Sequence, residues 1–510
     1  MLRRAAALLA FLLLFALAPP AASSTAAQPV QGYVDTHNHL MSHEAFGGRL
    51  ICGKPFHPDG PARALLDCLD HHPNGELAWF ENFTRTGSPT GTHDPVGWPT
   101  FRDWPAHDSM THQQNYYEWI ERAWRGGLRI MVNDLVANRQ LCAIYPIKTN
   151  SCDEMTTLRL EARRTFELQD HIDAQAGGPG QGWFRVVRSA EEARAVIAQG
   201  KLAVVLGIET SEPFGCRTTL GIPHCTRAQI DRGLDEMHAL GVRSMFVCHK
   251  YDNALCGVRF DSGTQGAIVN AGNFLSSGSF WRVERCTGPA HDNTIVPGVL
   301  PKELSLGIPP LPLYPPGPHC NVKGLTALGR YMIEGMIARG MIVEIDHMSV
   351  KAAAQTLDLL ESRGYPGVIS SHSWTDPTYF RRIYQLGGMI TPISGHAEEF
   401  TRTWRETKAL RDELGKTGFG YGMDANGMHA LPGPRAGSAV TYPLPGGLAR
   451  PMTGQRTWDY NVDGVAHYGL VPDWVEDMRA VAGEDFVRDM AAGAEAYLQT
   501  WQAATTRATR

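Results

Sequence analysis

The stretch Tyr33–His39, with the sequence YVDTHNH, decides the fold of this chain: it is a short apolar run that ends in two histidines. Alternate side chains of a β-strand point to the same face of the sheet. We therefore expect His37 and His39 to project together and share one metal ion, while Asn38 points away. Because one metal ion needs three or four ligands, further ligands are expected at the ends of later strands.

Short apolar runs recur along the chain. Continuous rather than alternating hydrophobicity is typical of parallel strands that are buried on both faces. The eight runs are Gly32–Asp35, Leu128–Asn133, Leu202–Glu209, Val242–Cys248, Met341–Asp346, Gly367–Ser371, Gly388–Thr391 and Phe419–Asp424. Helical segments are expected between many of them, namely Ser189–Gln199, Thr226–Leu240, Leu325–Ala338 and Ser349–Arg363. This alternation predicts an α/β fold, a (β/α)8 TIM barrel.

Residues at the helix ends support these assignments. Ser189 is an expected N-cap, and Glu192 would complete a capping box with it. Gly241 follows the second predicted helix and is the residue type that best ends a helix in the left-handed conformation. Trp474–Arg507 is expected to form terminal helices on the outside of the barrel.

Three long connections interrupt the alternation. They follow the first, fourth and eighth predicted strands and are rich in Gly, Pro, Trp and Cys: Met41–Glu118, Tyr251–Lys323 and Ala425–Asp463. Long connections without regular structure usually form functional lids or walls. Because all three follow strand ends, we expect them on the catalytic face of the barrel.

Candidate metal ligands close several of the predicted strands. The set consists of Glu209, His249, His347, His372 and Asp424, in addition to the first pair. His347 and His372 are 25 residues apart, which fits one strand–helix–strand step. Singly, a strand-end histidine is more often structural, and Asp424 could cap a helix. Six strand-end positions on one face favour a metal site. We interpret the other histidines, including His43, His57, His71, His72 and His93, as surface or structural residues.

Composition and targeting signals define the setting. With 43% hydrophobic and 19% charged residues the chain is globular, and its net charge of −5 gives no reason to expect a nucleic-acid partner. Residues 1–27 read as a signal peptide, with Arg3 and Arg4 before an apolar stretch too short for a membrane span. We expect a secreted or periplasmic protein with a single domain over residues 28–510; an uncleaved N-terminal anchor is the alternative.

Ten cysteines in an exported chain predict disulfides. Adjacent pairing is one of many connectivities that the sequence allows. It would join Cys52 to Cys68, Cys142 to Cys152, Cys216 to Cys225, Cys248 to Cys256 and Cys286 to Cys320. Cysteine ligands to a metal are the weaker alternative, because the chain has no C-x-x-C motif.

The motifs and their order resemble the metal-dependent amidohydrolase superfamily and, within it, the membrane (renal) dipeptidase family. The matching segments are Val34–His39, Leu206–Glu209, Val247–His249, Ile345–Ser349, Ser370–Ser373, Gly422–Asp424 and Asp463–Asp473. The resemblance runs from Gly32 to Met478 and is interrupted by the long insertions. It implies a TIM barrel with two zinc ions and a small peptide or amide as substrate. Relatives often form dimers, so it leaves a homodimer open.

The resemblance also implies roles for individual residues. His37 and His39 would bind the more buried zinc, and Glu209 would bridge it to a second zinc held by His347 and His372. Asp424 would handle the proton of the bridging water, and His249 would contact the substrate and its developing oxyanion. Arg381 or Arg382 lies near the position of a family arginine that meets the substrate carboxylate, although a solvated surface pair explains both arginines equally well.

One departure bears on the substrate. Membrane dipeptidases usually have His-x-Asp at the first pair, whereas this chain has His39, so the site carries one negative charge fewer. The sequence therefore predicts an exported zinc hydrolase that cleaves a dipeptide-like amide bond by a metal-bridged hydroxide. The alternatives are another hydrolase of the superfamily, acting on a lactone, cyclic amide or phosphoester, and a catalytically silent barrel that binds a ligand.

Overall fold

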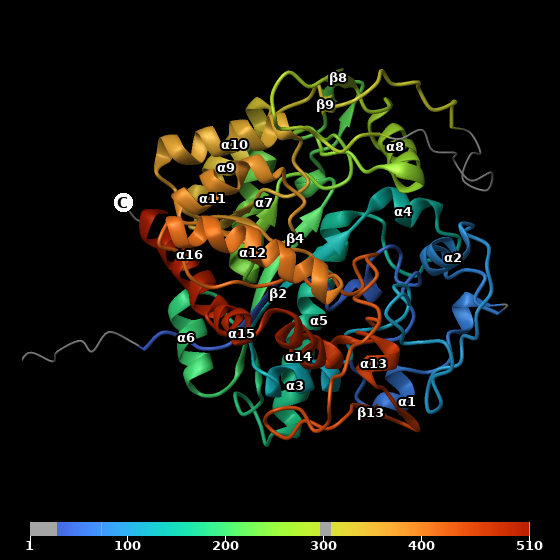
Figure 1. The fold of residues 1–510 in the computed structure, drawn as a ribbon. Helices are drawn as coiled ribbons and strands as arrows, with labels where there is room; N and C mark the ends of the chain where they lie inside the picture. The colour runs from blue at the N-terminus through green and yellow to red at the C-terminus, as the bar shows by residue number, and fades with distance from the viewer. Residues whose placement is uncertain (1–27, 73, 296–307, 509–510) are drawn as a thin grey trace, which may run out of the picture.

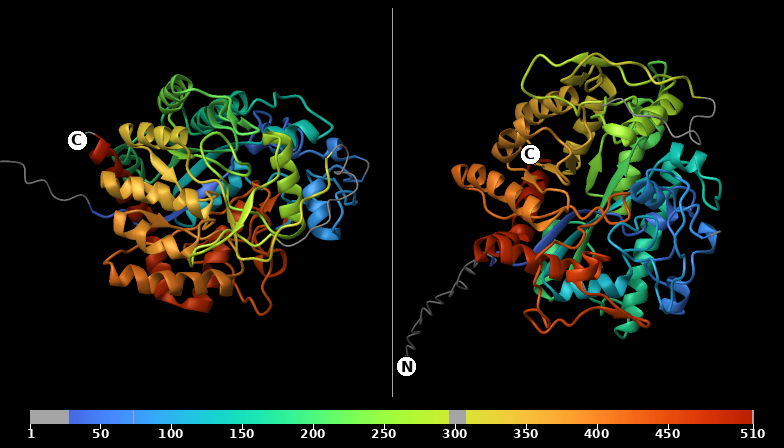
Figure 2. Two further views of the ribbon diagram at one scale, coloured as in Figure 1. Left: turned by 90° about the horizontal axis from the view of Figure 1, so that it is seen from above. Right: turned by 45° about the vertical axis from the view of Figure 1, so that its right-hand side comes forward.

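The computed structural model describes residues 28–72, 74–295 and 308–508, so the predicted signal peptide lies outside the described residues. Helices surround two parallel sheets, and irregular connections gather on one side (Figures 1 and 2). The helices are α1 (Pro61–Ala64), α2 (Trp79–Thr86), α3 (Tyr117–Arg125), α4 (Arg139–Ile144), α5 (Glu154–Gln175), α6 (Ala190–Ala198), α7 (Arg227–Leu240), α8 (Gly263–Ser277), α9 (Ala327–Ala338), α10 (Val350–Arg363), α11 (Phe380–Leu386), α12 (Ala397–Glu413), α13 (Tyr460–Asp463), α14 (Val471–Ala482), α15 (Glu484–Ala491) and α16 (Gly493–Ala508).

Each main sheet has four parallel strands, as expected for the buried apolar runs. The first sheet has the order β1 (Tyr33–Asn38), β2 (Leu128–Ala137), β4 (Leu202–Thr210) and β3 (Phe184–Val186). The second has the order β12 (Met389–Ile390), β11 (Val368–Ser370), β10 (Ile342–Glu344) and β7 (Ser244–Phe246). Antiparallel pairs lie in the long connections: β5 (Thr218–Thr219) with β6 (Ile222–Pro223), β8 (Val283–Arg285) with β9 (His319–Asn321), and β13 (Met452–Thr453) with β14 (Arg456–Thr457).

The expected closed barrel is not present as one continuous sheet. Seven of the eight predicted strands form, but the eighth, Phe419–Asp424, makes only isolated bridges. Parallel bridges connect the two sheets at Leu206–Val242, Asp35–Tyr421 and Ile393–Gly422. The ladder is interrupted where only these single bridges form, between β4 and β7 and on both sides of the eighth segment. The short strands β7, β10, β11 and β12 pair with one another in register.

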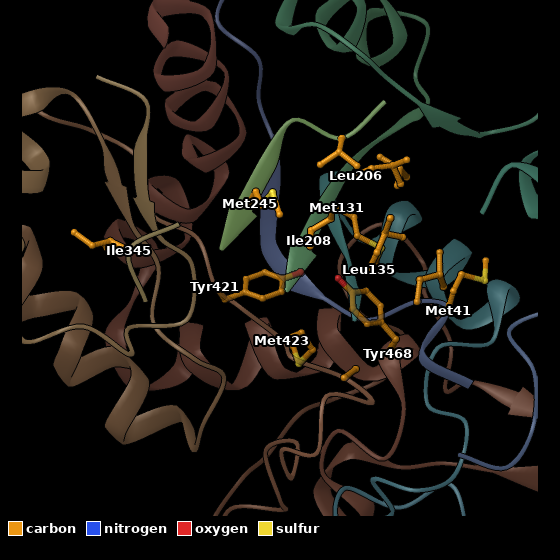
Figure 3. Packing of buried hydrophobic residues seen from close by; sticks show 14 of the residues in the cluster. Met41, Met131, Leu135, Leu206, Ile208, Met245, Ile345, Tyr421, Met423 and Tyr468 are labelled. Carbon is orange, nitrogen blue, oxygen red and sulfur yellow. The ribbon is translucent and has the colours of Figure 1, made fainter. Parts of the chain in front are cut away.

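Side chains from both sheets nevertheless share one core. A single buried cluster combines residues of β1, β2, β4, β10, β11 and β12 with Tyr497, Leu498 and Trp501 of α16. A second, larger cluster fills the space toward the strand ends; in Figure 3, Met131, Ile208 and Met245 converge there with Tyr421 and Tyr468. The Tyr468 hydroxyl donates to Asp35 Oδ2 over 2.7 Å and so ties the C-terminal region to β1.

The predicted helices form with small differences. Ser189 caps α6 by accepting from the Glu192 amide, but the Glu192 carboxylate accepts from the Arg188 amide, so the expected capping box does not close. The box closes instead on α7, between Thr226 and Gln229. The predicted terminal segment divides into α14, α15 and α16. Among the described residues, no helix is both long and apolar enough to span a membrane.

All five predicted disulfides are present, and each closes a local loop within or beside a long connection. The first and third connections lie side by side, where Figure 1 shows α1 next to α13. The Gln455 amide donates to the Pro99 carbonyl, and Trp458 Nε1 donates to the Pro105 carbonyl. The side chain of Asn115 donates to the carbonyls of His39 and Ala425. The first connection therefore supports the segments that carry two of the candidate ligands.

Candidate metal centre

The structure brings together seven of the nine residues predicted for the site. His37 lies on β1 and Glu209 on β4, the other histidines follow strand ends, and Asp424 is the last residue of the eighth segment. The gathered set is His37, His39, Glu209, His249, His347, His372 and Asp424. Every member is at most 9% exposed. Residues from opposite ends of the chain thus meet where parallel strands end, as the topology predicts.

Glu209 stands at the centre of this set. Its Oε2 lies 3.7 Å from His37 Nε2 and 3.4 Å from His39 Nε2. Its Oε1 lies 3.2 Å from His347 Nε2 and 3.5 Å from His249 Nε2. Each carboxylate oxygen therefore faces a different pair of imidazoles.

Two further contacts complete the arrangement. Asp424 Oδ1 lies 3.1 Å from His39 Nε2 and 3.7 Å from His37 Nε2. His372 Nε2 lies 2.8 Å from His347 Nε2, and its ring stacks on that of His37 at 4.2 Å. Three overlapping groups of potential ligand atoms result: His37 with His39 and Asp424, His37 with Glu209 and His372, and Glu209 with His249 and His347.

A second set of acceptors orients the imidazoles. Asp134 Oδ2 lies 3.0 Å from His37 Nδ1, and the Asp134 carbonyl lies 2.8 Å from His39 Nδ1. Asp346 Oδ2 lies 3.2 Å from His372 Nδ1 and also accepts from the His372 amide. A partner at Nδ1 fixes the tautomer and turns Nε2 toward the centre, as in metal-binding histidines. The sequence analysis did not select Asp134 or Asp346; their signal was a carboxylate within or directly after an apolar strand run.

The backbone at the site is strained. His347 has φ +63° and Asp424 has φ +53°, and Ser373 and Asn426 also have positive φ. Residues other than glycine adopt this left-handed region at a cost of about 1–3 kcal/mol, and such residues gather at functional sites.

The electrostatics match a site for cations. Burial opposes charge on His37, yet Glu209 and Asp134 raise its pKa to about 9. Burial equally opposes ionisation of Glu209, but the surrounding histidines hold its pKa well below the usual range. The His39 imidazole, whose Nε2 lies 3.1 Å from Asp424 Oδ1, likewise lowers the pKa of Asp424. Burial lowers the pKa of His249 to about 3, so this ring is neutral at neutral pH. The centre thus combines two ionised carboxylates with imidazole nitrogens. A metal ion that binds these nitrogens would displace their protons.

Unpaired atoms show that these residues fit a metal. His37 Nε2, His39 Nε2, Glu209 Oε1 and Asp424 Oδ1 are buried and make no hydrogen bond to any residue in the described ranges. Buried polar atoms without partners are costly, whereas cations placed between these nitrogens and oxygens would satisfy all of them. The donor set of imidazoles and carboxylates suits zinc.

The two remaining predicted residues lie elsewhere. Arg381 is exposed and pairs with Glu413, and Arg382 pairs with Asp358 and Glu361 on α10. Both guanidinium groups are held by acidic side chains of the outer helices. The two arginines are therefore better described as a solvated surface pair than as ligands of the substrate. The substrate-binding role expected for them has no support in this geometry.

A cation missed by the sequence analysis lies closer to the centre. Lys250 Nζ sits 5.2 Å above the Trp374 ring, which in turn lies 5.6 Å from the ring of His347. The Lys250 side chain is 20% exposed and lies 3.2 Å from Asp261. Its signal in the sequence was its position directly after His249.

No family model matches the chain, and no curated protein matches it. Among solved structures it is similar to a metallo peptidase from Rhodobacter sphaeroides liganded with a phosphinate mimic of the dipeptide L-Ala-D-Ala, at 14% identity and TM-score 0.46, covering 92% of this chain and 99% of that one. It is also similar to the dipeptidase AC, a metallo peptidase of family M19, at 13% identity and TM-score 0.44, covering 76% and 89%.

A third similar structure is an amidohydrolase from Pseudomonas aeruginosa, at 12% identity and TM-score 0.43, covering 76% of this chain and 93% of that one. These proteins are described as an amidohydrolase and metallopeptidases, the families that the sequence motifs resemble.

Proposed function

We propose that this protein is a metal-dependent hydrolase that uses two zinc ions to cleave an amide bond of a small, dipeptide-like substrate. The observation that carries the proposal is the position of Glu209, whose two oxygens face two separate pairs of histidines. A carboxylate in this position can serve two cations a few ångströms apart. His37 and His39 would hold one ion. The other would be held by His347, which faces Oε1, and by His372, whose Nε2 lies 2.8 Å from His347 Nε2; His249 is kept for the substrate.

We infer that the eight strand segments form an irregular (β/α)8 barrel in one domain. The three parallel bridges between the sheets and the core shared by six strands support this inference. An open sheet would leave the edges β1 and β12 without the contacts that Tyr421 and Gly422 make. The short strands then reflect local irregularity of the barrel rather than a different fold.

The catalytic roles follow from charge and position. The zinc pair, when bound, would lower the pKa of a water molecule so that it can attack the substrate carbonyl at neutral pH. The Asp424 carboxylate is ionised, so it can accept the proton of that water and pass it to the amine as the C–N bond breaks. Neutral His249 can donate a hydrogen bond to the oxyanion that develops on the carbonyl oxygen.

Lys250 replaces Arg381 and Arg382 as our candidate for binding the substrate's carboxylate. It is partly exposed and stands beside Trp374 at the His347 side of the centre. A fixed cation there would orient a free C-terminal carboxylate, which dipeptides have and capped amides lack.

We further propose that the protein is exported, with residues 1–27 as its signal peptide. Five disulfides support this location, because they persist in oxidising compartments and are rare in the cytosol of most cells. A homodimer remains part of the proposal only through the family resemblance.

The test is hydrolysis by protein stripped with a chelator and reloaded with zinc. We expect cleavage of one or more members of a dipeptide panel, lost on stripping and restored by zinc. If the zinc form cleaves only lactones, cyclic amides or phosphotriesters, its substrate belongs to another class and the dipeptidase assignment is wrong. A zinc-loaded protein that cleaves nothing in these panels would support the silent ligand-binding barrel.

A further inference from the structure

A second cluster of buried histidines lies within the first long connection, outside the centre described above. Its members are His71 at the end of a short 3-10 helix, Glu81 on α2, His93, and His112, whose backbone forms an isolated β-bridge with Cys52. His71, Glu81 and His112 have no exposed surface, and His93 is 8% exposed. Cys68 lies close to His71 and His112 but is bonded to Cys52, so it offers no thiolate.

Hydrogen bonds fix which nitrogens of two rings carry protons. His112 Nδ1 lies 2.6 Å from Glu81 Oε1, which also accepts from the amide and hydroxyl of Thr111. His71 Nε2 lies 3.1 Å from the Leu50 carbonyl, which can only accept. His112 Nδ1 and His71 Nε2 are therefore the donors, and the opposite nitrogens of both rings present lone pairs.

These lone pairs face one another. His71 Nδ1 lies 3.3 Å from His112 Nε2, and in neutral rings no proton is left for this contact. His93 Nε2 lies 3.3 Å from the same His112 nitrogen. His112 Nε2 thus has one nitrogen of each neighbouring ring within 3.3 Å, and His93 Nε2 also lies 3.5 Å from Glu81 Oε2.

The spacing of these nitrogens matches that of ligands around a metal ion. A tetrahedral zinc ion with Zn–N bonds of about 2.0–2.1 Å separates neighbouring ligand nitrogens by about 3.3–3.4 Å. Both nitrogen–nitrogen contacts to His112 have this length. A proton on His93 Nε2 could bridge its contact with His112, but the contact between His71 Nδ1 and His112 Nε2 would still lack one. A metal ion beside His112 Nε2 would serve both contacts.

We propose that His71, His93 and His112 bind a divalent transition-metal ion, with Glu81 orienting His112 from outside the ligand set. Three neutral imidazoles favour zinc and its neighbours over magnesium or calcium, which prefer oxygen ligands. A carboxylate on the far nitrogen of a ligating histidine is the usual supporting arrangement. This site does not depend on the proposed hydrolase function.

The position of the cluster gives the ion a structural role. The His112 carbonyl accepts from Asn426 Nδ2 over 2.6 Å, and Asn426 lies two residues beyond Asp424. Asn115, three residues beyond His112, donates to the His39 and Ala425 carbonyls. An ion on His112 would therefore hold the first connection against the segments that carry the catalytic residues.

The first test is metal content per chain after zinc loading and removal of free zinc. We expect the double variant His71→Ala/His93→Ala to hold one equivalent fewer than the wild type. The control His72→Ala changes an exposed neighbour of His71 and should keep the full amount. Equal zinc in the wild type and the double variant overturns the proposal.

A second measurement avoids the risk that the double variant does not fold. Crystals of the zinc-loaded wild-type chain, measured at the zinc absorption edge, should give an anomalous peak within bonding distance of His71 Nδ1, His93 Nε2 and His112 Nε2. A map that shows zinc at Glu209 and none between these three rings overturns the proposal and indicates an extra proton instead. It would leave the hydrolase assignment intact.

Discussion

The two histidine clusters are built from the same side chains but by different means. The centre around Glu209 collects its members from strand ends spread between His37 and Asp424. The cluster around His112 takes all of its members from a single irregular connection between His71 and His112. The difference teaches that the pattern of strands in a sequence predicts a site formed at strand ends. The same pattern gives no information about a site formed within an irregular connection.

The clusters also differ in how their carboxylates act. Glu209 points both oxygens at imidazole Nε2 atoms, whereas Glu81 holds His112 by its Nδ1. We therefore interpret Glu209 as a ligand to two ions and Glu81 as a support for one ligand. Changes at the first cluster should act on the reaction, and changes at the second on the architecture of the first connection.

The largest effect is expected for Glu209→Gln. Loss of the bridging carboxylate removes a ligand from both ions. Mutation of a residue that only supports a ligand costs about 10–100-fold, so the rate of zinc-dependent hydrolysis should fall by more than about 100-fold. Zinc per chain, measured together with the rate, should also fall. The exposed Glu191→Gln is the matched control and should match wild type. A Glu209→Gln protein with full zinc and full rate would refute the bridging role.

Asp424→Asn should separate proton transfer from metal binding. An amide cannot accept the proton of the attacking water, so kcat should fall by roughly 10²–10⁴-fold while most of the zinc stays bound. Steady-state kinetics and zinc content on the same sample provide the measurement, with the exposed Asp485→Asn as control. A parallel loss of zinc and rate would instead make Asp424 mainly a ligand.

Asp134→Asn tests the support of the first cluster and should have an intermediate effect. The His37 imidazole would lose its ionic partner at Nδ1, and zinc affinity or activity should fall by about 10–100-fold. Titration of the stripped variant with zinc should show activity recovering at higher zinc than in wild type. If saturating zinc does not restore the wild-type rate, the variant does not act through metal affinity.

Lys250→Met should affect binding more than turnover. Loss of a charged hydrogen bond to the substrate carboxylate should raise KM for free dipeptides by roughly 10-fold, with little change in kcat. Dipeptide amides, which lack the carboxylate, provide the internal comparison and should respond less. An equal rise in KM for both substrate types would exclude carboxylate recognition by Lys250.

The smallest effect concerns a buried histidine outside both clusters. His467 stacks on Trp119 at 4.2 Å, its Nδ1 accepts from the Gly469 amide, and burial lowers its pKa well below 6.5. Below about pH 6.5 the folded chain therefore binds fewer protons than the unfolded chain. The contribution of neutral His467 to stability is present above that pH and is lost as the pH falls.

His467→Asn keeps an acceptor for the Gly469 amide and removes the titration. The free energy of unfolding, measured in urea at several pH values, should depend less on pH below about pH 6.5, by at most about 1.4 kcal/mol per pH unit. The exposed His72→Asn should retain the wild-type slope. Identical slopes in the wild type and His467→Asn would show that His467 is charged in the folded chain.

Much of the fold could be predicted because local patterns and packing agree. Seven predicted strands form, and Gly241 ends α7 in the left-handed conformation, as its position indicated. Closure of the barrel could not be predicted in detail, because it depends on pairing between segments of two or three residues whose ends are set by tertiary contacts. Arg381 was misplaced because a motif register does not reveal that Glu413 lies within reach.

The sequence by itself determined which strand ends carry His37, Glu209, His347 and Asp424, since a strand fixes the side on which each residue projects. Only the tertiary structure decided that Glu209 faces two pairs of histidines and that Asp134 and Asp346 orient them. The tertiary structure also showed that His71 and His93, which we expected to be surface or structural residues, lie beside His112 and are candidate ligands. An irregular connection has no period, so its contacts are set by the disulfide and the packing that fold it.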